Sequence, residues 1–356
     1  MNNQKKLKSM ITPLLSWYEK NERPLPWRKD PTPYHVWISE IMLQQTRIEA
    51  VIPYYERFLK EIPDVASLAA VPDDKLMKLW EGLGYYSRAR NLKKAALTVM
   101  EKYDGKLPDS AEELRRLSGI GDYTAGAIAS ISFGKPEPAV DGNVLRVIMR
   151  YLGKTDDIAL QSTKKETAHA LRSVYPSGKS AKNLTQAIME LGESVCIPNG
   201  QPKCEFCPLA ALCAAKAENL TDSIPVKSPK KPRKQEPKTV FLLSCRGKYA
   251  IRKRPEAGLL AKLWEFPNTE QKLSEEEALA YLSSLGLSPI GIASCGEAVH
   301  IFTHIEWHMT GYTAECLYPT EDFVWKSSEE ILSDYAIPSA FRAYVSHIKK
   351  ERNFKS

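Results

Sequence analysis

The densest group of potential metal ligands in this chain is four cysteines within eighteen residues: Cys196, Cys204, Cys207 and Cys213. Four thiolates can bind an iron–sulfur cluster or a tetrahedral zinc ion, and either would organise a loop that needs no regular secondary structure. A four-cysteine zinc site usually contains two C-x2-C pairs, whereas the spacing here, C-x7-C-x2-C-x5-C, contains one. The spacing therefore favours iron–sulfur over zinc, with unrelated free thiols as the third alternative.

Disulfide bonds are the least favoured explanation of the cysteines. The chain has 356 residues and an odd number of cysteines, seven, and a protein of this length needs no disulfides for stability. We interpret Cys245, Cys295 and Cys316 as small core residues. No apolar run approaches the roughly 20 residues of a membrane span, and the first residues lack a signal-peptide pattern, so we expect a cytoplasmic protein.

A basic, proline-rich segment divides the chain. Residues 227–238 (KSPKKPRKQEPK) hold six Lys or Arg and one Glu, which supplies +5 of the formal net charge of +7. Its prolines cannot continue a helix or a central strand, so we predict an extended linker at 221–237, with phosphate binding as the alternative role. Residues 1–220 and 238–356 are then two domains, and a hydrophobic content of 43 % suffices for two cores.

The two predicted domains differ in their patterns. Before the linker, apolar residues at helical spacing predict an all-α domain with helices at 36–52, 65–81, 87–101, 110–117, 123–132, 143–152 and 163–192. After the linker, two strand-like runs flank Arg246-Gly247 as a hairpin, and residues 306–316 alternate in polarity. A helix with a capping box, Ser274 and Glu277, and a C-terminal helix complete an α+β domain.

Residues from about 110 to 132 match a helix-hairpin-helix pattern. Gly119 and Gly121 allow a tight turn without side chains, so the amides that open the next helix can approach a DNA phosphate. An ordinary helix connection is the alternative, and the two interpretations are evenly balanced, because Gly126 and the small residues after it also permit close packing.

Two carboxylates have contrasting predicted surroundings. Glu40 has Val36, Trp37 and Leu43 as helical neighbours, an apolar setting that should raise its pKa and keep it protonated. Asp141 precedes a helix as a candidate N-cap, where backbone amides favour the ionised form. One acid and one anion are what glycosidic cleavage needs. Taken alone, each residue is more often structural: Asp141 as a plain cap, and Glu40 as a polar residue on a partly buried helix.

Several segments together resemble adenine DNA glycosylases of the MutY type over nearly the whole chain: WISEIMLQQT, LWEGLGYYSRARNL, SGIGDYTAGAIAS, PAVDGNVLRV, the cysteine loop, GLLAKLWEFP and FTH. The resemblance implies an all-α helix-hairpin-helix domain of the endonuclease III superfamily, then an α+β Nudix-like domain. It implies a base-excision-repair enzyme that flips adenine out of a mispair with 8-oxoguanine or guanine in double-stranded DNA and hydrolyses its N-glycosidic bond. It also implies a 4Fe-4S cluster on the four cysteines.

The resemblance assigns a role to each matching position. Glu40 matches the general acid at adenine N7, and Asp141 matches the carboxylate that stabilises the oxocarbenium ion or its covalent adduct. The remaining positions match supporting residues of the catalytic site (Tyr123, Asn143), the adenine pocket (Trp27, Arg28, Gln186), wedges into the duplex (Gln45, Tyr85) and the loop that reads 8-oxoguanine (Phe302, Thr303, His304).

Departures from related patterns sharpen these expectations. Endonuclease III carries a lysine that forms a Schiff base where this chain has Tyr123, so we expect hydrolysis without efficient strand cleavage. Residues 259–287 lack the paired glutamates after an Arg-Glu step that a Nudix hydrolase uses for Mg²⁺, so we expect no pyrophosphatase activity. The family's usual Ser is Thr303 here, which keeps the hydroxyl and adds a methyl group.

The first cysteine spacing is seven where the family has six, and Asn199-Gly200 can absorb the extra residue in a turn. We expect a monomer that acts on DNA at the nucleoid, and the linker is a candidate binding site for a repair partner such as a clamp. The main alternative to the enzyme is a non-catalytic DNA-binding metalloprotein that uses the hairpin, the linker and the metal loop to hold duplex DNA.

Overall fold

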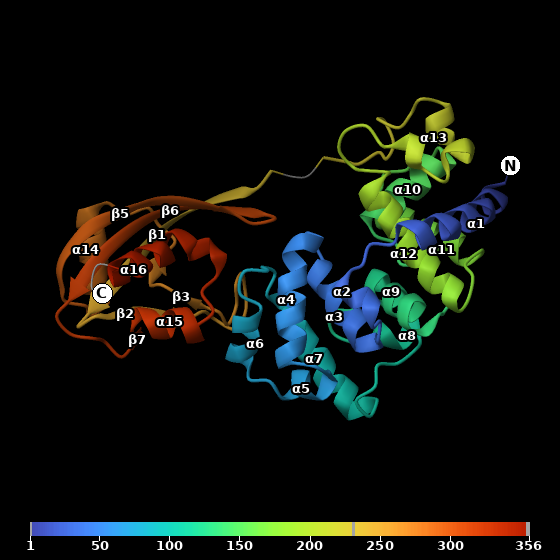
Figure 1. Cartoon of the computed structure of the whole chain (residues 1–356). Coiled ribbons are helices and arrows are strands. Elements are labelled where there is room, and N and C mark those ends of the chain that lie inside the picture. Colours follow the sequence, from blue (N-terminus) through green and yellow to red (C-terminus); the bar gives the residue numbers. More distant parts are fainter. Residues whose placement is uncertain (1, 230–231, 354–356) are drawn as a thin grey trace. The chain divides into compact units, whose positions relative to one another are not determined.

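The computed structural model describes residues 2–229 and 232–353, which form two compact units (Figure 1). Unit 1 comprises residues 2–70 and 90–229, and unit 2 comprises residues 71–89 and 232–353. Lys230 and Lys231 of the predicted linker lie outside the described residues. In the ranges that are described, no helix is both long and apolar enough to cross a membrane.

Unit 1 is helical, as the sequence predicts. Its elements are α1 (Asn3–Asn21), α2 (Pro26–Lys29), α3 (Pro33–Leu43), α4 (Ile48–Glu61), α5 (Val65–Ala70), most of α7 (Ser87–Lys102), α8 (Ala111–Leu114), α9 (Asp122–Phe133), α10 (Gly142–Leu152), α11 (Gln161–Arg172), α12 (Lys179–Ser194), η1 (Cys204–Phe206), η2 (Ala210–Leu212) and α13 (Ala214–Ala217).

Three predicted helices are each two helices in the structure. The range 36–52 is interrupted after Leu43, where Gln45 has a left-handed backbone (φ 59°). The range 65–81 breaks before Pro72, and 163–192 breaks at residues 173–178, which contain Pro176 and a left-handed Gly178. Proline disfavours a helical conformation for the residue before it, and a periodicity count does not register that restriction. The predicted helix 110–117 is also shorter, because α8 ends at Leu114.

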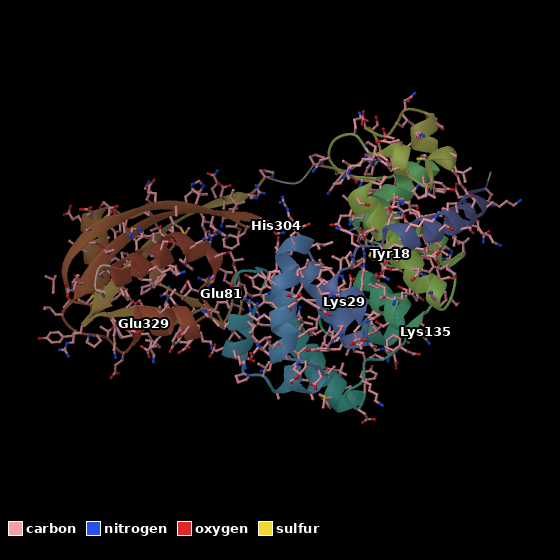
Figure 2. All side chains as sticks on the ribbon, viewed as in Figure 1. Tyr18, Lys29, Glu81, Lys135, His304 and Glu329 are labelled. Atoms are coloured by element: carbon pink, nitrogen blue, oxygen red, sulfur yellow. The ribbon has the colours of Figure 1, made fainter. Side chains whose placement is uncertain are left out.

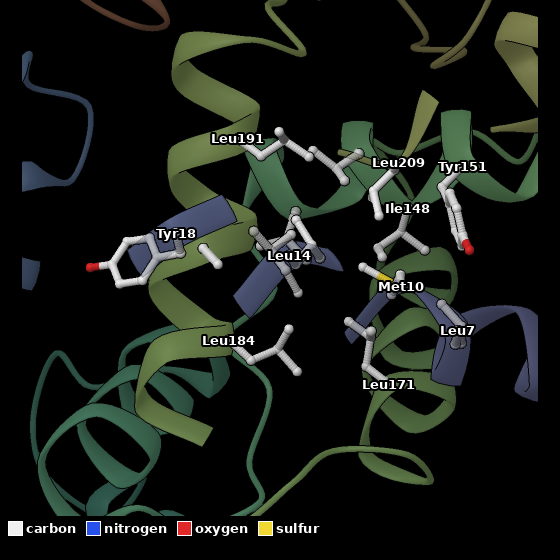
Figure 3. Packing of buried hydrophobic residues seen from close by; sticks show 14 of the residues in the cluster. Leu7, Met10, Leu14, Tyr18, Ile148, Tyr151, Leu171, Leu184, Leu191 and Leu209 are labelled. Carbon is white, nitrogen blue, oxygen red and sulfur yellow. The ribbon is translucent and has the colours of Figure 1, made fainter. Parts of the chain in front are cut away.

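The core of unit 1 forms where α1 packs against α10 and α12 (Figure 3). Leu14 and Tyr18 on α1 are fully buried, as are Leu184 and Leu191 on α12 to within 2 %. The two residues of each helix lie four or seven positions apart and so lie on one face of that helix. Burying each such side chain stabilises the fold by about 1.5–3 kcal/mol.

A chain of buried hydroxyl groups connects α9 and α12. The Thr185 hydroxyl lies 2.8 Å from both the Tyr175 hydroxyl and the Ser130 hydroxyl, and Ser130 donates to the carbonyl oxygen of Gly126 at 2.7 Å. Ser130 and Thr185 are at most 1 % exposed, so water does not replace these bonds.

Replacing Thr185 by Val should therefore lower the free energy of unfolding by about 1–2 kcal/mol, since at unchanged volume it takes away the partner of the buried Tyr175 hydroxyl. Urea denaturation would measure the loss. Thr98→Val is the matched control. The hydroxyls of Thr98 and Thr185 each donate to the carbonyl oxygen four residues earlier, at 3.1 and 3.0 Å, but Thr98 is partly exposed on α7. Equal stability losses in the two variants would contradict the role of the buried chain.

Unit 2 contains a mixed sheet and several helices. Its elements are α6 (Asp73–Leu79), β1 (Lys234–Cys245), β2 (Lys248–Lys253), β3 (Trp264–Glu265), β4 (Asn268–Thr269), α14 (Glu275–Ser284), β5 (Pro289–Ile301), β6 (Ile305–Cys316), β7 (Val324–Lys326), α15 (Ser328–Asp334), η3 (Ser339–Phe341) and α16 (Arg342–Asn353). The strand order is β3-β2-β1-β6-β5, with β1 and β6 parallel and β5 antiparallel to β6.

Alternating side chains of β1 serve two cores on opposite faces of this sheet. Val240 and Leu242 pack with residues of α16, whereas Phe241 and Leu243 pack with residues of α14. All four are at most 2 % exposed, as expected for a strand covered on both faces.

Most local predictions for this unit are confirmed. The hairpin at Arg246-Gly247 joins β1 and β2, and the capping box of Ser274 and Glu277 starts α14. Cys245 and Cys316 are core residues at 3 % exposure, while Cys295 is only partly buried. The predicted end of the linker at residue 237 needs correction. Strand β1 begins at Lys234, because its first residues already pair with β6. Local composition does not predict pairing with a strand about 70 residues away in the sequence.

Candidate active site

Glu40 is a buried acid in unit 1. It lies on α3 among the apolar neighbours that the helical spacing predicts, and it is 6 % exposed. The Tyr123 hydroxyl of α9 donates a hydrogen bond to Glu40 Oε2 at 2.6 Å. Burial raises the pKa of Glu40 to about 7 even though this hydrogen bond lowers it. Glu40 is therefore substantially protonated at neutral pH, in agreement with the sequence-based expectation.

Asp141 caps the N-terminus of α10, as predicted. Its Oδ1 accepts from the Val144 amide at 2.8 Å, and its Oδ2 accepts from Asn143 Nδ2 at 2.9 Å. The expectation of a favoured ionised form needs correction, because burial raises the pKa of Asp141 and outweighs the lowering by these hydrogen bonds. The burial comes from tertiary packing, which a cap motif does not reveal.

The two carboxyl groups interact electrostatically. A negative charge on Asp141 raises the pKa of Glu40, so the pair favours one shared proton over two anions. Asp141 accepts more hydrogen bonds than Glu40, which favours the proton on Glu40 and the charge on Asp141. The arrangement can donate a proton and stabilise a developing cation.

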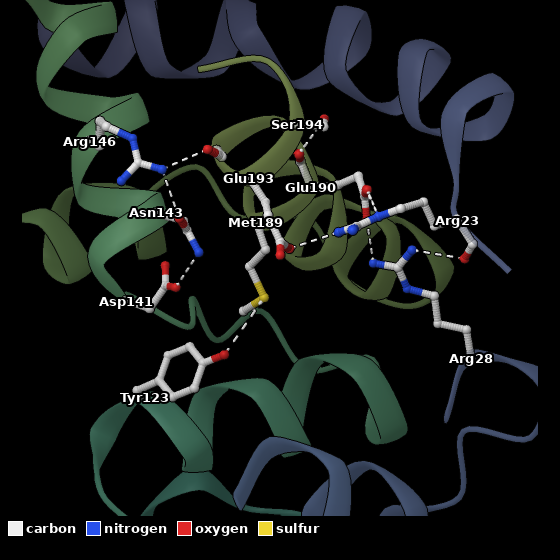
Figure 4. Close-up of polar contacts among 11 residues, drawn as sticks. Arg23, Arg28, Tyr123, Asp141, Asn143, Arg146, Met189, Glu190, Glu193 and Ser194 are labelled. Atoms are coloured by element: carbon white, nitrogen blue, oxygen red, sulfur yellow. Dashed lines mark hydrogen bonds and ion pairs between the residues drawn. The ribbon is translucent and has the colours of Figure 1, made fainter. Parts of the chain in front are cut away.

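Glu190, which was not among the site residues predicted from the sequence, lies at the centre of an ion-pair cluster (Figure 4). Glu190 on α12 is 2 % exposed and pairs with Arg23 Nε and, at 2.7 Å, with Arg28 Nη2. Arg23 also pairs with Glu193 at 2.7 Å. The available signal was a glutamate on the apolar face of α12, one turn after Gln186. Arg28, a predicted pocket residue, thus belongs to this cluster, and its positive charge also lowers the pKa of Glu40.

Arg146 connects the Asp141 side of the site to the cysteine loop. Its Nη2 donates to Asn143 Oδ1 at 2.7 Å and to the Gly192 carbonyl at 2.6 Å, and its Nε donates to the Cys196 carbonyl at 2.6 Å. Gly192 permits the close approach, since a Cβ there would lie 2.7 Å from Asn143 Cβ. Arg146 therefore links Asn143, which hydrogen-bonds Asp141, to the backbone of the first cysteine of the loop.

The four predicted metal ligands line one small cavity in unit 1, together with Val147, Arg150, Tyr151, Leu191 and Leu209 among others. Arg150 Nη1 lies 3.4 Å from Cys196 Sγ, a donor suited to a thiolate. Within residues 2–229 and 232–353, no three His, Cys, Asp or Glu side chains converge as they would around a single ion. The four thiols share one cavity, and four thiolates are a ligand set that can bind a metal centre. Gly200 (φ 77°) forms the turn in the longer first spacing.

The hairpin glycines differ in what the fold requires of them. Gly119 has φ 78°, and a Cβ there would lie 2.7 Å from Asn91 Cβ, so folding requires glycine. Gly121 has φ −92°, and a Cβ there would have nothing within 4 Å. Gly126 is required by packing, since its Cβ would lie 2.4 Å from the Pro138 carbonyl oxygen. Gly121 therefore leaves open space at the N-terminus of α9 that the fold does not use.

The other predicted positions in unit 1 are dispersed around these groups. Trp27 is buried at 7 % exposure and packs edge-on against Tyr55 at 5.4 Å. Gln186 is 5 % exposed on α12. Gln45, by contrast, is exposed and has a left-handed backbone, an uncommon state for a residue other than glycine.

Unit 2 brings together the predicted wedge Tyr85 and the β5–β6 turn. The Tyr85 hydroxyl lies 3.0 Å from Thr303 Oγ1, and its ring is 43 % exposed with a left-handed backbone (φ 46°). The turn is closed by a hydrogen bond from the Phe302 amide to the Ile305 carbonyl at 2.8 Å. His304, labelled in Figure 2, lies in this turn, and its side chain is exposed, as is that of Thr303.

Comparison with known proteins assigns the family. An adenine DNA glycosylase of Buchnera aphidicola subsp. Acyrthosiphon pisum is 36 % identical over 314 residues, which cover 87 % of this chain and 87 % of that protein. The chain belongs to the adenine DNA glycosylase family. The human adenine DNA glycosylase is 34 % identical to this chain over 402 residues, which cover 93 % of this chain and 73 % of the human protein.

Each half of this glycosylase-family chain also matches a domain family. Residues 38–177 match the HhH-GPD superfamily of base excision DNA repair proteins, and residues 239–347 match the NUDIX domain. Among solved structures, a thermostable thymine-DNA glycosylase is similar with a TM-score of 0.54 and 28 % identity, covering 60 % of this chain and 98 % of that one. The fold class predicted from the sequence is confirmed.

Proposed function

We propose that this protein hydrolyses the N-glycosidic bond of adenine mispaired with 8-oxoguanine, or with guanine, in double-stranded DNA. The observation that carries the proposal is the buried Glu40, with a pKa of about 7, beside the capped and hydrogen-bonded Asp141. Membership of the adenine DNA glycosylase family supports adenine as the base that leaves.

In the proposed mechanism, Glu40 gives its proton to N7 of the flipped adenine. The bond between C1′ of the sugar and N9 then breaks, and both its electrons leave with the base. Asp141 stabilises the resulting oxocarbenium cation, directly or as a covalent adduct, until water adds its oxygen to C1′ and releases a proton. Tyr123 holds Glu40 at Oε2, and Asn143 holds Asp141 at Oδ2.

The product of this reaction is an abasic site without strand cleavage. A lyase that cuts the strand forms a Schiff base, which requires an amine, and Tyr123 supplies a phenol that is engaged with Glu40. Burial and the neighbouring carboxylates raise the pKa of this phenol well above its ordinary value, so it stays protonated as a donor. These observations favour a monofunctional glycosylase over a combined glycosylase and lyase.

Unit 2 supplies the proposed reader of the opposite base. The turn of Phe302, Thr303 and His304 presents a hydroxyl and an imidazole to solvent next to the exposed Tyr85 ring. A hydroxyl and an imidazole can hydrogen-bond the edge of an oxidised guanine, and a ring can stack beside it. Nudix hydrolysis is not proposed, because residues 259–287 lack the Arg-Glu step followed by paired glutamates that binds Mg²⁺ in Nudix hydrolases.

A 4Fe-4S cluster is the proposed occupant of the four-cysteine cavity, where it would fix the loop's fold. The expected result of elemental analysis is about four iron atoms per protein chain and no stoichiometric zinc. Cys207→Ser should lose the visible absorbance, whereas Cys295→Ser in unit 2, as the control, should retain it. One zinc per chain would instead identify a single-ion site.

Gly121→Ala should weaken binding of duplex DNA by about tenfold while leaving the free energy of unfolding unchanged, because the methyl group blocks a phosphate from the amides that open α9. Gly126→Ala should show the opposite pattern and lose about 1–3 kcal/mol of stability by overpacking. Fluorescence anisotropy and urea denaturation would measure the two effects. Unchanged DNA affinity in Gly121→Ala would argue against phosphate binding at the hairpin.

The decisive experiment is base release under single-turnover conditions from duplexes with A opposite 8-oxoguanine, G or T. We expect release of adenine from the first two and intact strands until alkali is added. A protein that binds these duplexes without releasing adenine would instead be the non-catalytic DNA-binding metalloprotein, for which the open space at Gly121 is the favouring observation.

A further inference from the structure

The linker enters unit 2 directly beside the β5–β6 turn. Strand β1 starts at Lys234, which pairs in register with Ile305, the first residue of β6. The Lys234 amide donates to the His304 carbonyl at 3.0 Å. The residue before β1, Arg233, is therefore held against the turn that the proposed function assigns to lesion reading.

Arg233 is attached to this turn through one side of its guanidinium group. Its Nε donates to the Phe302 carbonyl at 3.0 Å, and the residue is exposed. Among the described residues, its two terminal nitrogens have no hydrogen bond or ion pair. The guanidinium is thus oriented by one donor while its remaining donors face solvent, an arrangement that suits a bidentate anion.

The carbonyl that orients Arg233 belongs to a well-supported residue. The Phe302 ring packs edge-on against Trp307 at 4.8 Å and His300 at 4.6 Å. Trp307 is 2 % exposed, so Phe302 rests on the core of unit 2. An arginine bound to this carbonyl has a defined position relative to Thr303 and His304.

Among the residues that the structure describes, no carboxylate forms an ion pair with Arg233. Glu236 at the start of β1 pairs with Lys234 at 3.0 Å, and Glu306 at the start of β6 pairs with His308 at 3.1 Å. Strand β5 also exposes apolar side chains near this turn, since Val299 and Ile301 are each 56 % exposed. An exposed cationic group such as Arg233 is the kind of side chain that contacts the phosphate oxygens of a nucleic-acid backbone.

We infer that Arg233 binds a backbone phosphate of the strand that carries the base read by the turn. Arginine can bond the Phe302 carbonyl through Nε and a phosphate through its terminal nitrogens at the same time, whereas lysine has one nitrogen for both. The contact would fix the position of the β5–β6 turn along the DNA strand. This inference rests on the proposed lesion-reading role of Phe302, Thr303 and His304.

The test compares Arg233→Gln, Arg233→Lys and the control Arg246→Gln, which removes the same charge at the opposite end of β1. Dissociation constants are measured against salt concentration for an undamaged duplex and for a duplex with an uncleavable adenine analogue opposite 8-oxoguanine. Arg233→Gln should weaken binding by about tenfold and reduce the slope of log K against log salt by about 0.9. Arg246→Gln should behave as the wild type.

Arg233→Lys should keep most of the salt slope and lose part of the preference for 8-oxoguanine, because its charge remains while the bond to Phe302 is lost. A wild-type slope and affinity in Arg233→Gln would overturn the inference, as would an equal loss in Arg246→Gln. Failure of the proposed function is distinct: the wild type would then show no preference for 8-oxoguanine. The salt slope on the undamaged duplex would still test the phosphate contact.

Discussion

Glu40→Gln should slow single-turnover release of adenine by about a thousandfold, because a glutamine cannot donate the proton that the leaving base requires. The fold should survive, since the amide oxygen of Gln can still accept the hydrogen bond that Tyr123 donates to Glu40 at 2.6 Å. Quenched-flow or manual sampling with an A:8-oxoguanine duplex would measure the rate.

Glu49→Gln is the matched control, because Glu49 is an exposed glutamate on α4. It should release adenine at the wild-type rate. Retention of the wild-type rate by Glu40→Gln would remove Glu40 from the mechanism even if the enzyme is an adenine glycosylase.

The pH dependence of the wild-type rate follows from the pKa of Glu40, which burial raises to about 7. Glu40 acts in its protonated form, so the rate should fall about tenfold per pH unit above this pH. The rate should also fall at lower pH, where Asp141, whose pKa is raised by burial, takes up a proton and loses the charge that stabilises the cation. In Glu40→Gln the decline at high pH should be absent. A wild-type rate that rises through pH 7 would mean that the base form of the group is the active one.

Asp141→Asn should reduce adenine release by at least about a hundredfold, because it removes the negative charge that opposes the developing cation. Asparagine is as good an N-cap as aspartate, so its side-chain oxygen can keep the bond from the Val144 amide, now 2.8 Å. The expected result is a stable, DNA-binding protein with little activity. Any residual activity should decline at lower pH than in the wild type, because the Asp141 charge raises the pKa of Glu40.

Asp64→Asn provides a control with the same local geometry. Asp64 accepts a hydrogen bond from the amide three residues later, Ser67, at 2.8 Å, but it is exposed and distant in sequence from the site. It should keep full activity. If Asp141→Asn instead loses as much activity as it loses folded protein in circular dichroism, its role is that of a cap.

Local rules predicted the elements that depend on near neighbours in the sequence. The helical neighbours of Glu40 predicted an apolar setting, and the structure gives the raised pKa that follows. The position of Asp141 directly before a predicted helix predicted an N-cap, and the hydrogen bond from the Val144 amide is present. The capping box at Ser274 and the β1–β2 hairpin are of the same kind. In each case the deciding contacts span about four residues.

Predictions failed where the deciding contact is long-range. Glu190 gained its significance from Arg23 and Arg28, which are more than 160 residues away in the sequence. The pKa of Asp141 is raised by burial under distant segments, although its own cap lowers it. Arg146 meets the Cys196 carbonyl fifty residues later, and no periodicity signals that bond.

The four cysteines show the division between sequence and structure. The sequence by itself determined that four thiols are close enough along the chain to share a metal centre, and that the acid and the carboxylate lie far upstream. Only the tertiary structure decided that these thiols line one cavity and that Arg146 ties their loop to Asn143 and hence to Asp141. The reason is that ligand spacing and helix periodicity are properties of a few consecutive residues, whereas burial and pairing between helices depend on how the whole chain packs.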